Sequence, residues 1–363
     1  MEKQKLKNKK IISILVVIAI VLIIVILQFS KVSFIKLENS SKINSNSVSE
    51  RVLEKSKLYP AAKELVHPDG FININPFNLS DYIGKKVILL DFWTYSCINC
   101  QRTFPYLESW NEKYSDKGLL IIGIHTPEFN FEKEYNNVQK ATEEFGIKYP
   151  VVLDNNYLTW QAYGNQYWPR EYLIDIDGFI VHDHIGEGGY AETETAIQDA
   201  LKERLEVLGM NETINSGLTQ GNSTIQFSGI KTPEIYFGYK FSRGQLGNRG
   251  GWKPEQVGEY SLPEKLKEDK FYLSGSWKNN LDSMELVSDT GEVDLKYFSK
   301  DVNIVAGANS LVQVTSYLDG EKRKEVEVKD QKLYNVISEG DYNSHTLKLK
   351  VEKGFKIYTF TFG

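Results

Sequence analysis

Cysteine is scarce in this sequence: its 363 residues contain two, Cys97 and Cys100, separated by two residues. A structural zinc ion needs four ligands, and the histidines that could join the cysteines, His182 and His184, are more simply the end of a hairpin strand. A permanent disulfide here would close a very small loop, and disulfide stabilisation grows with loop length. Redox exchange is therefore the favoured interpretation. With no third cysteine, the pair must exchange electrons with other molecules.

Basic charge is also in short supply. The formal net charge is -5, and outside the first ten residues the chain has no excess of lysine and arginine, so nothing in it indicates nucleic-acid binding. Hydrophobic residues make up 41% of the chain and charged residues 25%, which is ordinary globular composition. No internal repeat is present. The length predicts two domains, each with its own core.

The N-terminal segment is a candidate membrane anchor. Five lysines among the first ten residues precede an apolar run, Ile11 to Leu27, that only Ser13 interrupts. Its length is at the low end for a spanning helix, and the lysines would stay in the cytoplasm by the positive-inside rule. The competing interpretation is a cleaved signal peptide, but no small-x-small site follows, and no cysteine is available for a lipid anchor. We therefore expect residues 1–29 to be a cytoplasmic end and a single-pass transmembrane helix.

The remaining domains would then lie outside the cytoplasm, where disulfide chemistry is permitted. Residues 30–57 are rich in serine, asparagine, lysine and glutamate and predict a flexible tether. Residues 58–210 alternate buried-strand patterns with helical patterns, which predicts an α/β domain with a mixed sheet. Within it, Asp177-Gly178 between two alternating segments is a hairpin signal.

Beyond this domain the pattern changes. Residues 211–229 are polar and contain glycine and serine, which predicts a linker. Over residues 230–363 helical periodicity nearly vanishes, and about seven short alternating segments predict an all-β, jelly-roll-like sandwich similar to carbohydrate-binding modules. Because the chain ends on such a segment, we expect the last strand to be paired into the sheet.

The cysteine pair stands where a buried strand gives way to a helix. Free N–H groups and partial positive charge at the helix N-terminus would stabilise a thiolate at Cys97, the attacking nucleophile. Cys100, one turn further, would resolve the mixed disulfide. Asp91, in the middle of an apolar strand, is costly to bury unless it has a task, and proton transfer with Cys100 is a plausible one. Pro105 lies inside the helix, and Pro169 follows Trp168 where a cis peptide would place its loop beside the cysteines.

These segments resemble a known family. "DFWTYSCINCQRTFP" is similar to the active-site segment of thioredoxins, and "YPVVLDNNYLTWQAYGNQYWPREYLIDIDG" resembles the central region of TlpA-like proteins. The combination with "HTPEF" and a following β-sandwich resembles the extracytoplasmic part of DipZ-type proteins over Tyr59 to Gly363. The resemblance implies a thioredoxin fold, a redox-active Cys97–Cys100 disulfide and a docking role for Pro169.

The resemblance also implies a partner. DipZ-type domains usually follow a multi-helix, CcdA-like membrane domain, whereas this chain offers a single candidate anchor, so a separate membrane electron donor is expected. Many relatives that serve cytochrome c maturation carry glutamate three residues after the second cysteine. This chain has Thr103 there, which leaves the substrate open.

Three further residues are candidates for substrate binding. Trp93 and Trp168 flank the expected site, and Glu128 follows the second buried strand, whose C-terminal end should meet the same sheet edge as Cys97. His125, at the end of that strand, is a weaker candidate. We expect no metal and no cofactor.

The sequence thus predicts a membrane-anchored thiol–disulfide oxidoreductase that reduces disulfides of exported proteins. One alternative is a peroxide-reducing enzyme that uses the same pair. Another is a cell-surface protein whose β-sandwich binds a cell-wall glycan while the first domain is a scaffold. For that role the candidate sugar-stacking residues are Tyr236, Tyr239, Trp252 and Trp277.

Overall fold

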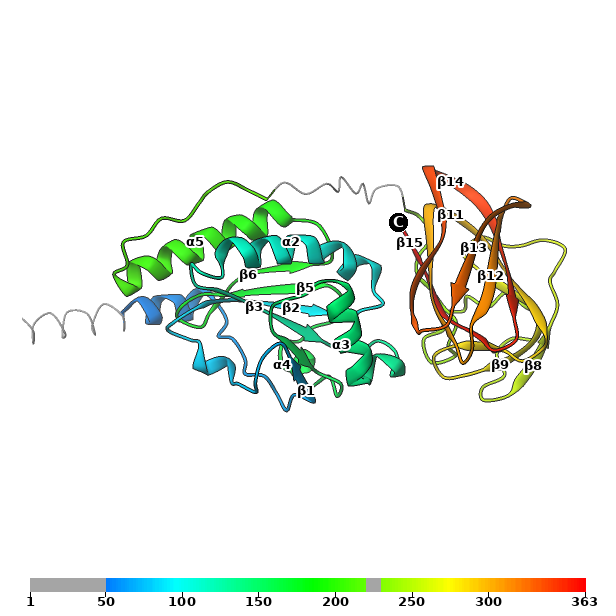
Figure 1. Cartoon of the computed structure of the whole chain (residues 1–363), viewed down its shortest axis with the longest axis horizontal. Coiled ribbons are helices and arrows are strands. Elements are labelled where there is room, and N and C mark those ends of the chain that lie inside the picture. The colour runs from blue at the N-terminus through cyan, green and yellow to red at the C-terminus, as the bar shows by residue number, and fades with distance from the viewer. Residues whose placement is uncertain (1–49, 220–229) are drawn as a thin grey trace, which may run out of the picture. The chain divides into compact units, whose positions relative to one another are not determined.

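The computed structural model describes residues 50–219 and 230–363 (Figure 1). The expected anchor, residues 30–49 of the expected tether and residues 220–229 of the expected linker lie outside the described residues. Residues 50–61 belong to a separate N-terminal unit, helical over 50–58, whereas Ala62–Gly363 form one compact unit. Among the helices of the described ranges, none is long and apolar enough to cross a membrane.

A six-stranded mixed sheet forms the centre of the α/β domain (Figure 1). In spatial order its strands are β1 (Gly70–Ile72), β4 (Val151–Leu153), β3 (Leu119–His125), β2 (Val87–Trp93), β5 (Arg170–Ile174) and β6 (Ile180–Ile185). β2, β3 and β4 run parallel, whereas β1 pairs with β4, β5 with β2, and β6 with β5 in the antiparallel sense. Asp177 and Gly178 form the turn between β5 and β6, so the predicted hairpin is confirmed.

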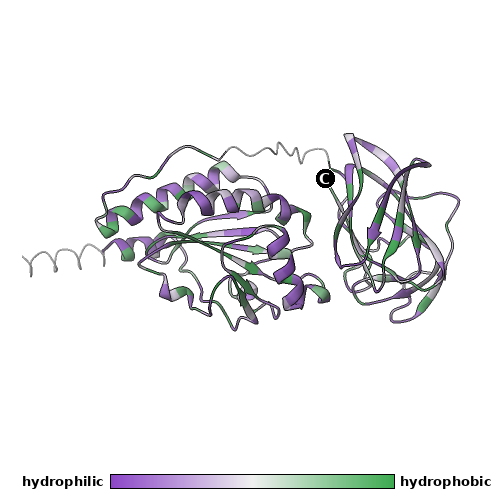
Figure 2. Cartoon of the chain, viewed as in Figure 1, coloured by the Kyte–Doolittle hydropathy of each residue, from purple (hydrophilic) through white to green (hydrophobic). Residues whose placement is uncertain are grey.

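Helices cover both faces of this sheet. They are α2 (Ile98–Tyr114), α3 (Tyr135–Glu144), α4 (Leu158–Ala162) and α5 (Tyr190–Leu208), with short 3-10 turns η1 (Leu79–Asp81) and η2 (Asn130–Lys133). α2 and α5 lie together on one face (Figure 1). Hydrophilic and hydrophobic residues alternate in bands along both helices (Figure 2), which is the pattern of helices with one buried side.

Burial on both faces explains the apolar run of β2, every residue of which is buried. Leu89 and Trp93 pack in the core under α2, α3 and α5, whereas Ile88 and Phe92 pack in the core under α4. A strand covered on both sides loses the polar–apolar alternation of a half-exposed strand. Asp91 is the one acid in this run and projects toward the same core as Leu89.

The C-terminal domain is all-β in the described residues. Its strands are β7 (Ile235–Tyr236), β8 (Val257–Tyr260), β9 (Phe271–Asn279), β10 (Met284–Leu286), β11 (Thr290–Ala308), β12 (Val312–Leu318), β13 (Glu321–Val328), β14 (Lys332–Glu352) and β15 (Phe355–Phe362). The sequence predicts about seven strands, whereas the described residues of this domain contain nine.

Two long strands, β11 and β14, belong to one hydrogen-bonded sheet that surrounds the hydrophobic core of this domain. β11 and β14 pair along most of their length, with a register shift between Ser299 and Asp301, and β11 also pairs with β9 and β15. Irregularities of this kind bend a strand and increase its twist. β15 pairs with β10 and β11, so the prediction that the last strand is paired is confirmed.

The four candidate sugar-stacking residues do not form one exposed platform. Trp277 is fully buried in the core of the β domain, and Trp252 packs against the same core. The Tyr239 hydroxyl donates a hydrogen bond to Glu255 (2.9 Å), and Tyr236 is buried. Trp277 and Tyr236 therefore serve packing, because a buried ring offers no face to a sugar.

Candidate redox site

Cys97 stands where β2 has ended and α2 begins. The turn Thr94–Ser96 leads from the strand to Cys97, which is the N-cap of α2 with extended backbone angles. The backbone amide of Cys100 donates to the Cys97 sulfur over 3.4 Å, one of the free N–H groups that a helix start offers. Cys97 is partly exposed, Cys100 is fully buried, and both are free thiols. The sulfur that a substrate can reach is therefore the one that faces the helix N-terminus.

A buried glutamate fixes the turn before Cys97. The Glu132 carboxylate, at η2, accepts hydrogen bonds from the Ser96 hydroxyl (2.6 Å) and the Ser96 amide (3.3 Å). Its other oxygen accepts from the amides of Glu128 (2.6 Å) and Phe129 (2.8 Å). Burial raises the pKa of Glu132, although these donors oppose the rise. The carboxylate thus ties together two turns that are far apart in the sequence.

The Cys100 thiol lies in a different environment from Cys97. Burial raises its pKa well above the usual value, and the neighbouring Cys97 and the charge of Asp91 add to the rise. Cys100 is therefore a protonated thiol at neutral pH. Since the thiolate is the nucleophile in disulfide exchange, its attack requires a base.

Asp91 is the buried acid whose charge acts on the pKa of Cys100. It is fully buried, and neither carboxylate oxygen has a hydrogen-bond partner among the described residues. Burial raises its pKa well above the usual range, and Glu171, its register partner on β5, raises it further. The hydroxyl of Tyr149, also buried and unpartnered in this part of the chain, faces the same acids. An acid with a raised pKa beside a buried thiol is suited to proton transfer.

Trp168 and Pro169 lie at the same end of the sheet as the cysteines. The peptide between them is cis, as predicted. Arg170 pairs with Phe92, so Pro169 stands beside the end of β2. The Trp168 indole donates to the Thr126 carbonyl (3.0 Å), and the Pro169 carbonyl accepts from the Gly186 amide (2.9 Å). Trp168 is partly exposed and remains available to a substrate.

Trp93 does not lie on the rim of the site. Its ring is fully buried and packs edge-on against Phe104 and His125. Gly123 on β3 provides the space that the Trp93 ring occupies, because a Cβ at this position would lie 2.6 Å from the indole nitrogen. The expectation of substrate contact is therefore corrected to a packing role. His125 is equally buried, and burial lowers its pKa to about 3, so it is neutral.

Glu128 faces the β domain within the unit Ala62–Gly363. Its carboxylate accepts a hydrogen bond from the Tyr236 hydroxyl (2.8 Å), which also donates to Glu234 (3.0 Å). Burial, Glu234 and Glu132 raise the pKa of Glu128 to about 8. The expected substrate-binding carboxylate is occupied in this structure by an intrachain contact.

Thr103 occupies the position where many relatives carry glutamate. Its hydroxyl donates to the Asn99 carbonyl (3.0 Å) and lies 3.4 Å from the Tyr190 hydroxyl of α5. Threonine is fully buried here and bonds within its own helix. The site consequently receives no carboxylate from this turn of α2.

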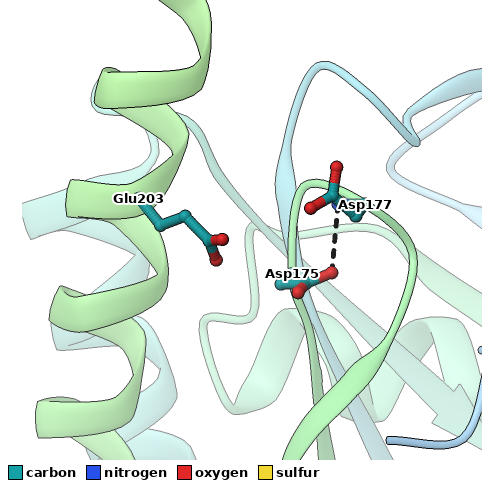
Figure 3. Close-up of side chains that lie close together, drawn as sticks. All are labelled: Asp175, Asp177 and Glu203. Carbon is teal, nitrogen blue, oxygen red and sulfur yellow. Dashed lines mark hydrogen bonds between the residues drawn. The ribbon is translucent and has the colours of Figure 1, made fainter. Parts of the chain in front are cut away.

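A group of acids lies at the β5–β6 turn, away from the cysteines. Asp175, Asp177 and Glu203 bring oxygen atoms within 4.8 Å of one another, and Figure 3 shows Glu203 reaching from its helix toward the turn. One Asp175 oxygen accepts from the amides of Asp177 (3.0 Å) and Phe179 (2.9 Å). These bonds hold the hairpin turn and account for Asp175 without a metal.

Sequence reasoning missed Glu132 and Glu171. Glu132 follows an aromatic run in "FNFEKEY" and looks like a surface charge until η2 folds back onto Ser96. Glu171 stands in "PREYLID", where its alternation with Tyr172 suggests an exposed face. The burial of Glu171 could have been predicted from its strand, because a strand that pairs with the buried β2 is itself covered on both faces.

Comparison with known proteins agrees with this geometry. Residues 57–201 match the Redoxin family, and residues 232–363 match the family described as "Thioredoxin like C-terminal domain". The chain therefore contains a thioredoxin-like domain of the Redoxin family, followed by a domain of this C-terminal family. Relatives that match the first domain include proteins named thiol–disulfide oxidoreductases, among them YkuV and ResA.

Three relatives of this thioredoxin-like chain differ in how much they share. "Protein DipZ" of Mycobacterium bovis is 37% identical over 309 residues, which are 83% of this chain and 43% of that protein. "Thiol-disulfide oxidoreductase YkuV" of Bacillus subtilis is 27% identical over 147 residues, 40% of this chain and 98% of that protein. A putative DsbE from Chlorobium tepidum is 25% identical, covering 39% of this chain and 96% of that one, with a TM-score of 0.35. The chain thus spans less than half the length of the DipZ relatives that it matches.

Proposed function

We propose that this chain is a membrane-anchored, extracytoplasmic enzyme that reduces disulfides of exported proteins by dithiol exchange. The observation that carries the proposal is the asymmetry of the two thiols. Cys97 is partly exposed and is the N-cap of α2, whereas Cys100 is buried, protonated and near Asp91. A nucleophile with a separate resolving thiol is what disulfide exchange needs.

The exchange runs in two balanced steps. The Cys97 thiolate attacks one sulfur of the substrate disulfide, forming a mixed disulfide and releasing one substrate thiolate. Asp91 then takes the proton of Cys100, whose sulfur attacks Cys97 and releases the second substrate thiolate. The substrate gains two electrons, and the enzyme is left with the Cys97–Cys100 disulfide. A separate membrane dithiol donor would return the electrons.

Pro169 and Trp168 are assigned substrate docking in this scheme. Pro169 stands beside the end of β2, and Trp168 offers a partly exposed ring. An extended substrate segment beside Pro169 would present its disulfide to Cys97. The five lysines among the first ten residues support the expected topology, in which that end lies in the cytoplasm.

Trapping of the mixed disulfide tests the proposal. The full chain carrying Cys100→Ser cannot resolve the intermediate, so expression in cells should leave exported proteins linked to Cys97 and released by dithiothreitol. Cys97→Ser is the matched control and should trap none. The purified full chain in detergent should also reduce insulin. Failure to trap any exported protein, together with inert insulin, would refute the proposal, whereas consumption of peroxide in place of insulin would indicate the peroxide-reducing alternative.

A further inference from the structure

Glu171 is a buried carboxylate that disulfide exchange alone does not explain. It lies on β5 directly opposite Asp91 on β2 and is only 2% exposed. Directly opposed residues of an antiparallel pair project to the same face, with Cβ atoms about 5 Å apart. Both acids therefore lie on the face that α2 and α5 cover, and one Glu171 oxygen has no partner among the described residues.

Hydrogen bonds lead from Glu171 toward the surface. The Thr193 hydroxyl, on α5, hydrogen-bonds to the Glu171 carboxylate. The same hydroxyl lies 3.1 Å from Nε2 of His182. Thr193 is fully buried, whereas His182 is half-buried on β6, the last strand of the sheet. The series thus begins beside Asp91 and ends at a side chain that reaches water.

A packing role does not account for this acid. A buried carboxylate is costly unless its oxygens receive several hydrogen bonds. Asp154 shows the structural alternative, because it accepts from the amides of Thr159 and Trp160 and from the Thr126 hydroxyl. Among the described residues Glu171 has no such set of donors: one of its oxygens is unpartnered, and the carboxylate receives a hydrogen bond from the Thr193 hydroxyl.

We propose that Glu171, Thr193 and His182 form a proton pathway that connects Asp91 with solvent during resolution of the mixed disulfide. This inference rests on the proposed function and adds positioning residues to it. They act on the reaction through Asp91 and do not touch the substrate.

The proton transfers balance at each step. Asp91 takes the Cys100 proton and passes it to the facing Glu171 carboxylate. Once Glu171 is protonated, the Thr193 hydroxyl turns its hydrogen from that carboxyl group to Nε2 of His182. Glu171 then donates its proton to the Thr193 oxygen as the Thr193 hydroxyl proton moves to Nε2. His182 then releases one proton to water. No electron moves along this pathway, and the reverse order returns a proton when the enzyme disulfide is reduced.

The neighbours of Glu171 suit this task. The groups that surround the acid pair come from three elements and one loop: Cys100 on α2, Tyr149 before β4, Tyr190 and Thr193 on α5, and His182 and His184 on β6. Burial raises the pKa of Glu171 to about 7, although the Thr193 hydrogen bond opposes the rise. Burial and the adjacent His184 lower the pKa of His182, so its ring is neutral near pH 7 and can accept a proton.

Single-turnover kinetics with the aromatic disulfide DTNB test the pathway in the full chain. The reduced enzyme releases one thionitrobenzoate when Cys97 attacks and a second when Cys100 resolves, so the two steps appear as separate phases. Thr193→Val removes the hydroxyl at almost constant volume. We expect the rate of the second phase to fall about tenfold at neutral pH. The acid limb of its pH–rate profile should move to higher pH, because ionised Glu171 loses a hydrogen-bond donor and its pKa rises. The first phase should not change.

Two further variants complete the test. Thr142→Val is the matched control, since Thr142 is equally buried and its hydroxyl donates only to the Val138 carbonyl of its own helix. Both phases should be those of the unsubstituted chain. His182→Ala should slow the second phase, and added imidazole should restore it, which a purely structural role would not allow.

A second phase with unchanged rate and pH profile in Thr193→Val would overturn the pathway. If that variant fails to fold, Glu171→Gln decides. Asp91 then loses its charged neighbour and its pKa falls, so the acid limb of the pH–rate profile of the second phase should move to lower pH. An acid limb at the same pH would overturn the inference. Absence of both phases in the unsubstituted chain would instead refute the proposed function, so the two failures are distinguishable.

Discussion

Replacing Glu171 by glutamine should stabilise the folded chain at neutral pH and above. The pKa of Glu171 is about 7 in the fold, against 4.5 for an ordinary glutamate, because burial disfavours the charged form. The folded chain therefore holds this proton more tightly than the unfolded chain. Below pH 4.5 the group is protonated in both states and the penalty is absent. As pH rises from 4.5 to 7, stability is lost, and above pH 7 the loss is constant.

The size of the effect follows from the same two values. One pH unit between them corresponds to about 1.4 kcal/mol, so the ionised carboxylate lowers the free energy of unfolding by about 3 kcal/mol above pH 7. Glutamine carries no charge at any pH. Urea unfolding of the full chain, followed by tryptophan fluorescence at several pH values, should therefore show the variant more stable at pH 8, with the difference shrinking toward pH 4.

A buried acid with the opposite environment is the control. Glu194 on α5 is also buried, but although burial opposes it, hydrogen bonds from Lys113 (2.7 Å) and the Thr219 amide (2.6 Å) lower its pKa. Glu194→Gln should thus destabilise the chain above pH 4.5, and the loss should fade as pH falls. If Glu171→Gln is no more stable than the unsubstituted chain at pH 8, the assigned cost of its buried charge is wrong.

Three further changes have definite expected outcomes. Asp91→Asn should slow the resolving phase of the DTNB reaction by about a hundredfold, because the base is lost; an unchanged phase would remove Asp91 from the mechanism. Glu132→Gln should lower the free energy of unfolding by about 2 kcal/mol, since the amide nitrogen would replace one of the two oxygens that accept hydrogen bonds from Ser96, Glu128 and Phe129; urea unfolding measures the loss. Gly123→Ala should destabilise by about 2 kcal/mol by displacing Trp93, and adding Trp93→Phe should recover part of it.

The sequence predicts the parts of this fold that depend on local pattern. The hairpin at Asp177-Gly178, the cysteines at a strand-to-helix junction and the all-β C-terminal domain follow from spacing and turn chemistry. The burial of Trp93 does not, because it depends on the absence of a side chain at Gly123 on the neighbouring strand. The hydrogen bond from Ser96 to Glu132 joins residues 36 positions apart, and no local sequence pattern predicts such a contact.

In the proposed mechanism, the two buried acids also let a thiol with a strongly raised pKa react. While Asp91 is ionised, its charge opposes ionisation of Cys100. Once Asp91 has taken the proton it is neutral, so the repulsion disappears at the moment the thiolate forms. The transfer moves one negative charge within the core and creates no additional charge there, which is the less costly change in a medium of low polarity. Glu171 acts in the same way in the proposed pathway. When it takes the proton from Asp91, the negative charge moves from one buried acid to the other and no additional buried charge is created.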